Sequence, residues 1–91
     1  MKQIWKYSLE VVDVQRVLMP ASSKLLTVQY QHDGPKLWAI VDPKESDACH
    51  REFVIIGTGN ATPRDIDALA YVATFQMREG ALVFHVFERT S

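Results

Sequence analysis

Short segments in which apolar and polar residues alternate recur along this chain of 91 residues. Alternation with a period of two places successive side chains on opposite faces, which is the pattern of a half-buried β-strand. The segment Phe53–Ile56 is apolar throughout and predicts a strand that is covered on both faces. The predicted strands cover residues 5–11, 14–19, 25–31, 37–41, 53–56, 69–77 and 82–88.

Turn-forming residues separate these segments. Residues 32–35 and 78–80 predict hairpin connections, and the polar segment 42–50 predicts an exposed loop. Thr62 is the predicted N-cap of one helical turn over residues 63–68. Seven short strands with at most one helical turn predict an all-β, mainly antiparallel fold, either a compact sandwich or a small barrel.

Composition indicates a folded chain with a single core. Hydrophobic residues make up 47% of the sequence and charged residues 23%, whereas disordered chains are poor in aromatic residues and highly charged. A length below about 100 residues leaves room for one domain, residues 1–91. The formal net charge of −1 argues against DNA as a partner, because affinity for phosphate backbones requires clustered positive charge.

The chain lacks the usual marks of export or membrane insertion. Cys49 is the only cysteine, so no internal disulfide is expected, which fits a reducing cytosol. The first residues contain no apolar run of signal-peptide length, and the apolar stretch 81–87 is far shorter than the roughly 18 residues of a membrane span. We expect a soluble cytoplasmic protein.

Residues for metal binding or catalysis are sparse. His32, His50, His85 and Cys49 lack the paired spacing of a zinc site, so no metal and no cofactor are expected. His50 follows Cys49 directly, and neighbours on an extended chain point to opposite sides. No serine lies in a Gly-x-Ser-x-Gly elbow. The sequence therefore predicts a protein that is not an enzyme.

One glycine-rich turn is a candidate ligand site. Gly57, Thr58, Gly59 and Asn60 follow the predicted buried strand, and glycines allow backbone N–H groups to approach an anion. Arg51 and Arg64 flank this turn and offer charge-assisted hydrogen bonds to a phosphate or carboxylate. The alternative is that the glycines only permit positive φ in a tight bend.

Aromatic residues and one histidine supply further candidates. Most of the nine aromatic residues are expected in the core of so small a domain. Trp38 is a candidate stacking floor for a base, and Trp5 and Tyr7 are candidate interface residues. His85 faces away from Phe84 and its apolar neighbours, and either contacts a ligand or is satisfied by a backbone carbonyl.

Several segments together suggest a family. They are the opening Met1–Tyr7, the segments Leu37–Ala39 and Val41–Pro43, Gly57–Gly59, Thr74–Gln76 and the ending Gly80–Glu88. With these segments the chain resembles an uncharacterised family of short proteins encoded by bacteriophages and prophages. The resemblance implies a phage context in a bacterial cytosol and carries no catalytic residues with it.

This context favours binding without turnover. The expected function is to counteract host immunity as a homo-oligomer that sequesters a small phosphorylated or nucleotide-derived signal. The alternative is a phage protein that inhibits or redirects a host defence protein by direct contact through an exposed strand edge or the tryptophan surfaces. A virion accessory component ranks third, and an enzyme ranks last because no acid, base or nucleophile constellation is present.

Overall fold

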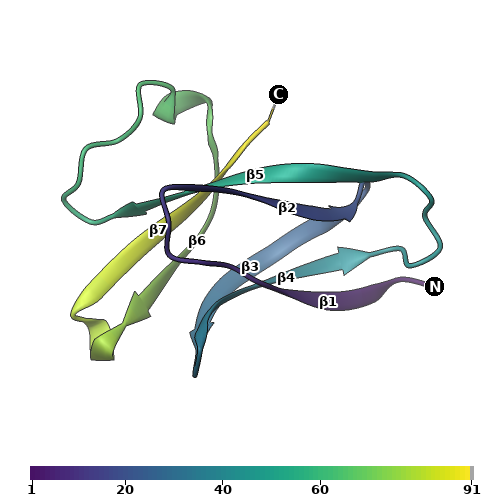
Figure 1. Ribbon diagram of the computed structural model, residues 1–91, viewed down its shortest axis with the longest axis horizontal. Helices are drawn as coiled ribbons and strands as arrows, with labels where there is room; N and C mark the ends of the chain where they lie inside the picture. The colour runs from purple at the N-terminus through teal and green to yellow at the C-terminus, as the bar shows by residue number, and fades with distance from the viewer. Residues whose placement is uncertain (91) are drawn as a thin grey trace.

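The computed structural model describes residues 1–90 and consists of seven β-strands with two short 3-10 turns (Figure 1). The turns lie at Ile66–Ala68 and Arg78–Gly80. The strands are β1 (Gln3–Ser8), β2 (Val14–Pro20), β3 (Lys24–Gln31), β4 (Gly34–Val41), β5 (Ala48–Gly57), β6 (Ala70–Met77) and β7 (Leu82–Arg89). The predicted all-β fold is confirmed.

The strands form two antiparallel sheets. One has the order β1-β4-β3 and the other the order β2-β5-β7-β6. β3 and β6 lie beside each other and join the two sheets at a seam. In Figure 1 the three-stranded sheet lies below β2 and β5 of the four-stranded sheet. Each sheet therefore has an inner face toward the other sheet and an outer face away from it.

The core fills the space between the inner faces. Phe53, Val28, Leu37 and Val86 are completely buried there, and Tyr7 and Phe84 pack at its margin. Phe75 and Phe84 stack with ring centroids 5.5 Å apart. Each fully buried large side chain contributes about 1.5–3 kcal/mol relative to exposure, so this cluster is the main source of stability.

The central strand β5 is buried on both faces, as its apolar sequence predicts. Phe53 and Ile55 belong to the core, whereas Val54 and Ile56 point to the outer face of the four-stranded sheet and are nevertheless buried. The connection 58–69, which rises above β5 in Figure 1, supplies part of their cover. The glycine-rich turn, residues 57–60, begins at the end of β5, beside this covered part of the outer face.

The structure corrects several predicted boundaries. β1 ends at Ser8 instead of residue 11, and the exposed loop ends before β5 begins at Ala48. Thr62 is not an N-cap: the 3-10 turn is preceded by Asp65, which makes no side-chain capping bond. The N–H groups of Ile66 and Ala68 donate to the backbone carbonyls of Pro63 and Asp65 instead, which takes the place of a side-chain cap.

The most consequential correction concerns β6. The alternation predicts Tyr71 on the same face as Ala73, Phe75 and Met77, but a register shift occurs between Tyr71 and Ala73. The extra residue moves Tyr71 to the outer face, where it is 61% exposed.

Along residues 1–90, no helix is long and apolar enough to span a membrane.

Candidate functional site

Four polar side chains form a continuous track on the outer face of the four-stranded sheet. Thr58 comes from the turn after β5, His85 from β7, and Thr74 and Tyr71 from β6. Thr74 is the direct cross-strand partner of His85, so the two side chains lie on one face. We call Thr58, His85, Thr74 and Tyr71 the polar track.

Short hydrogen bonds link every member of the polar track. Nε2 of His85 lies 2.7 Å from Oγ1 of Thr58, and Nδ1 of the same ring lies 3.0 Å from Oγ1 of Thr74. The hydroxyl of Tyr71 lies 2.7 Å from Oγ1 of Thr74. The imidazole is thus held on both nitrogens between two hydroxyl groups.

A backbone carbonyl sets the direction of these hydrogen bonds. Oγ1 of Thr58 lies 3.3 Å from the carbonyl oxygen of Val83, which can only accept. If Thr58 donates there, a neutral His85 must donate from Nε2 to Thr58 and accept at Nδ1 from Thr74. Thr74 then accepts from Tyr71. This is the one assignment for a neutral ring that satisfies all four contacts.

Tyr71 gives the polar track an aromatic surface. Its ring meets Phe87 edge to face, with centroids 5.7 Å apart, so the ring is held although most of it is exposed. An exposed ring that is fixed in this way offers a face for stacking a planar group. The polar track therefore combines hydrogen-bonding groups with an aromatic platform.

The glycine-rich turn closes one end of the polar track. The N–H of Asn60 donates to the carbonyl of Gly57 at 3.0 Å, and the N–H of Thr58 donates to the carbonyl of Val83 at 3.0 Å. Gly59 has φ +88°, which favours glycine, but Gly57 does not have a positive φ. Gly57 is needed for space instead, because a Cβ there would lie 2.8 Å from Nδ2 of Asn60.

Arg51 lies elsewhere and has partners of its own. Its Nε and Nη2 donate to the two carboxylate oxygens of Glu88 at 2.5 and 2.8 Å, and Nη1 donates to the carbonyl of Ser23 at 2.6 Å. The hydrogen bond with Glu88 raises the pKa of Arg51 above its ordinary value. Arg51 lines a hollow beside the seam of β3 and β6, together with Tyr71 and Glu88, and not the glycine-rich turn.

A second hollow of about 290 Å³ lies on the other side of the turn. Its lining includes the apolar side chains of Val14, Val54 and Ile56, together with Asn60 and Pro63. This volume is at the lower limit of small-molecule pockets. The apolar part of this lining fits a neutral group better than a phosphate.

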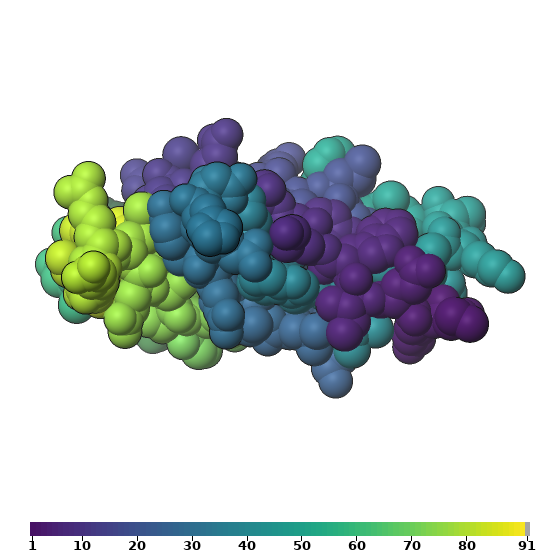
Figure 2. All heavy atoms as spheres, turned by 90° about the horizontal axis from the view of Figure 1, so that it is seen from below, coloured from purple at the N-terminus to yellow at the C-terminus, as the bar shows by residue number. Residues whose placement is uncertain are grey.

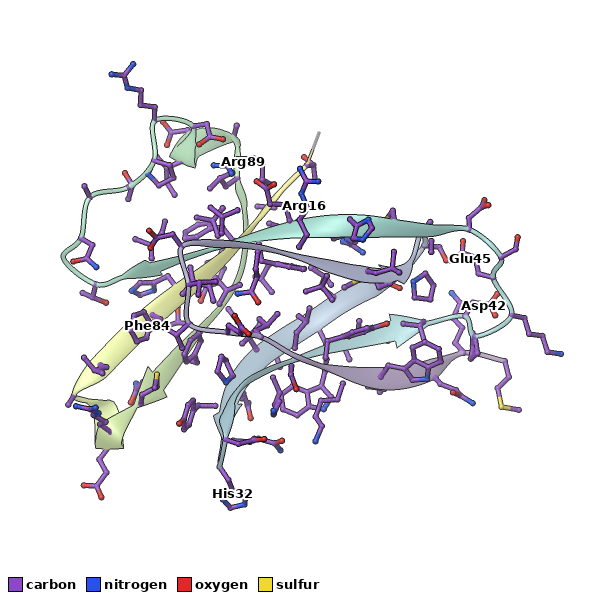
Figure 3. The ribbon with its side chains drawn as sticks, viewed as in Figure 1. Arg16, His32, Asp42, Glu45, Phe84 and Arg89 are labelled. Carbon is purple, nitrogen blue, oxygen red and sulfur yellow. The ribbon has the colours of Figure 1, made fainter. Side chains whose placement is uncertain are left out.

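Arg89 also lines this hollow, but carboxylates compensate its charge. Its guanidinium contacts Asp65 at 2.7 and 2.9 Å and Glu52 at 2.5 Å. Arg16 also reaches Glu52, and Figure 3 shows Arg16 and Arg89 on the same outer side of β5. Hydrogen bonds from Arg89 lower the pKa of Asp65 and of Glu52. The pair between Arg89 and Asp65 fastens the connection 58–69 to β7.

The remaining predicted residues are spread over the molecule. Arg64 is exposed in the connection 58–69. Trp38 is half-buried in β4 of the three-stranded sheet, and Trp5 is 38% exposed on its edge strand β1. Tyr7 faces the core, and its hydroxyl is buried without a hydrogen-bond partner in the described part of the chain. The structure thus brings together Gly57, Thr58, Gly59, Asn60 and His85, and separates them from Arg51 and Trp38.

Sequence reasoning missed Thr74 and Tyr71. The signal for Thr74 lies in the hairpin of β6 and β7: once its register is known, Thr74 stands opposite His85. Tyr71 gives no such signal, because only the register shift places it on the outer face. Within residues 1–90, no group of three or more His, Cys, Asp or Glu side chains is arranged to hold a metal ion.

Comparisons with known proteins, solved structures and family models bear on the identity of the chain. No curated protein and no solved structure matches the chain. A family model described as a domain of unknown function, DUF7352, matches residues 1–91. Because the match spans the chain from end to end, the protein belongs to the DUF7352 family.

Proposed function

We propose that this protein binds a small nucleotide-derived molecule at the polar track, without chemical turnover, and thereby sequesters a signal of its bacterial host. The observation that carries the proposal is the clamped imidazole of His85, held between Thr58 and Thr74 beside the exposed ring of Tyr71. The phage context rests on the resemblance of the sequence. The anti-defence role follows from that context.

The chemistry of the polar track suits a nucleoside. Hydroxyl groups both donate and accept, so Thr58 and Thr74 can exchange their internal hydrogen bonds for bonds to ribose hydroxyls or to base edges. A planar base can stack on Tyr71, since stacking of a base on an aromatic side chain is worth about 1–3 kcal/mol. Tyr71 is open enough to accept such a base.

The direction of the hydrogen bonds favours binding over catalysis. A hydroxyl nucleophile needs a neighbouring base that removes its proton. In the assignment above, the proton of Thr58 points to the carbonyl of Val83, and Nε2 of His85 carries a proton toward Thr58. A threonine, not a carboxylate, orients the other ring nitrogen. Thr58 is therefore not activated.

The charges of the protein near the polar track indicate which part of the ligand it recognises. The four members of the polar track are neutral when His85 is neutral, and Arg51 and Arg89 are paired with carboxylates. Phosphate groups therefore add little. We expect adenosine and AMP to bind within a few-fold of each other, whereas removing the base or the ribose abolishes binding.

Calorimetry and thermal shift test the proposal. The ligands are adenosine, AMP, ADP-ribose and a set of cyclic di- and trinucleotides. Thr74→Val and Tyr71→Leu are expected to weaken binding at least tenfold, while Thr27→Val, on the other sheet, leaves it unchanged. Absence of heat and of any melting shift for the whole set would refute the proposal. Native mass spectrometry of the protein from its expression host then shows whether an oligomer encloses a copurified ligand.

The unpaired edge of β1 supports a second candidate function, inhibition of a host protein by direct contact. β1 pairs with β4 only, and on this strand Ile4 is 62% and Trp5 38% exposed. An exposed, partly apolar strand edge can accept a strand from a partner. A pull-down from host lysate in which Ile4→Lys removes a specific partner would favour this function. Capture of the same partner by the Ile4→Lys variant would count against this function.

A further inference from the structure

The charges of the protein are distributed unevenly between the two sheets. β1, β3 and β4 carry Lys6, Lys24 and Lys36 and contain no aspartate or glutamate. The net charge of −1 is a sum over the whole chain, whereas the charged residues in the strands of the three-stranded sheet are all lysines. Acidic residues sit at its ends, as with Asp33 in the turn between β3 and β4. The expectation against DNA rests on the net charge of the whole chain, which does not describe the charges of this sheet.

The register places the lysines around a tryptophan on the outer face of this sheet. Leu37 and Ala39 point into the core, so Trp38 between them points outward. Trp38 stands directly opposite Lys6 of β1 on one side and Thr27 of β3 on the other. We call Lys6, Trp38 and Lys24 the basic face.

The next row completes the basic face. Ile40 stands opposite Ile4 on β1 and opposite Lys24 on β3. Lys24 thus lies one row from Trp38 on the side away from Lys6. Strands two positions apart in a sheet are separated by about 10 Å, so the two ammonium groups flank the tryptophan from opposite sides. Figure 2, which views the molecule from below, shows β1 and the turn between β3 and β4 at the surface.

Lys6 and Lys24 are free to meet an anion. Lys36 already contacts Ser8 at 3.0 Å and Asp33 at 3.1 Å and is buried. Lys6 contacts only the neutral amide of Gln31, at 3.3 Å, and within residues 1–90 neither Lys6 nor Lys24 forms an ion pair. The charge of Lys6 contributes to the lowered pKa of Asp33, but that carboxylate pairs with Lys36 instead. Lys6 and Lys24 thus place two exposed charges without a direct ion pair beside a half-buried aromatic ring.

We propose that the basic face binds single-stranded nucleic acid, with a base on Trp38 and backbone phosphates on Lys6 and Lys24. Proteins that bind single strands combine positive charge along the backbone with aromatic side chains on which bases stack. The open face of a sheet suits an extended chain. A duplex keeps its bases paired and offers no free base to Trp38. The site shares no residue with the polar track and does not depend on the function proposed there.

The test uses Trp5→Phe protein, in which Trp38 is the one remaining tryptophan. Its fluorescence is followed during titration with the single-stranded DNA dT12, the matching duplex, and a polyglutamate peptide. Single-stranded DNA is expected to quench the fluorescence at low salt, with the duplex binding at least tenfold more weakly. The logarithm of the binding constant should fall by about 0.7 per neutralised phosphate for each unit of log salt.

Matched lysine variants assign the site. Lys6→Gln and Lys24→Gln should each weaken binding several-fold and reduce the salt dependence by about one phosphate contact. Lys44→Gln, in the loop after β4, is the control and should bind like the parent protein. All three replacements are at exposed positions, so the fold is retained, and their melting curves verify this. Trp38→Leu should abolish binding; because this variant lacks the fluorescent residue, its binding is measured by the anisotropy of fluorescein-labelled DNA.

Three results would overturn the proposal. The first is absence of quenching by dT12 at low salt. The second is binding that Lys6→Gln and Lys24→Gln leave unchanged. The third is equal quenching by polyglutamate, which would assign the basic face to an acidic protein partner instead of a nucleic acid.

Discussion

Removing one member of the pair between Arg51 and Glu88 should destabilise the protein strongly. The two side chains are only 18% and 10% exposed, and two parallel hydrogen bonds join them. A third bond ties Arg51 to the carbonyl of Ser23, which precedes β3. In Arg51→Met, the carboxylate of Glu88 stays in place without its counterion, and that uncompensated charge is the origin of the loss.

The magnitude follows from the burial of the pair. Breaking a buried ion pair by removing one partner costs about 3–5 kcal/mol, and the slight exposure of Glu88 places Arg51→Met near 3 kcal/mol. Glu88→Gln should cost less, about 1.5 kcal/mol, because Arg51 keeps its bond to Ser23. The double variant Arg51→Met with Glu88→Gln should lose less than the sum of the two single losses, since no charge is left unpaired.

Urea unfolding of the two single variants and the double variant measures this coupling. A loss of about 3 kcal/mol corresponds to a fall in Tm of roughly 12–24 °C for a domain of this size. If Arg51→Met unfolds within 0.5 kcal/mol of the unmodified protein, the pair does not stabilise the fold. If such a stable variant no longer binds the ligand, Arg51 contributes to the ligand-binding site.

Three further changes have defined outcomes. Tyr7→Phe removes a buried hydroxyl that has no partner among the described residues, and should raise the free energy of unfolding by about 1 kcal/mol; a loss in urea unfolding would mean that the hydroxyl is bonded. Glu79 has φ +57°, so Glu79→Gly should raise Tm while Glu79→Gln does not. Because Arg89 lowers the pKa of Asp65, the ionised Asp65 stabilises the fold fully above its ordinary pKa of about 4, and this stabilisation is lost as the pH falls through the lowered pKa. Asp65→Asn should therefore remove this contribution to the pH dependence of the urea midpoint.

Local patterns predicted the strands well because their causes are local. Arg78–Gly80 joins β6 and β7, and Gly80 has the positive φ that favours glycine, so the alternation and the glycine together predict this hairpin. The same alternation placed His85 on the face away from Phe84 and Val86, which the structure confirms. Five of the predicted ligand residues also gather at one place, since four of them are consecutive in the chain.

Long-range contacts could not be read from the sequence. Glu88, which pairs with Arg51, is 37 residues away, and nothing local marks either residue as a partner. The register shift in β6 adds one residue to that strand and so moves Tyr71 to the polar track. No glycine or proline stands at the shift to indicate it in the sequence. The basic face likewise emerges only when β1, β4 and β3 are aligned, because Lys6 and Lys24 belong to different strands of the sheet.

Nuclear magnetic resonance of the labelled protein during titration with ADP-ribose tests the proposed binding site most directly. The resonances of Thr58, Thr74 and the His85 imidazole should shift together and saturate, and in Thr74→Val the remaining shifts should need at least tenfold more ligand. Shifts that centre on other residues, or the absence of any saturable shift, would contradict the assignment of the polar track as the ligand site.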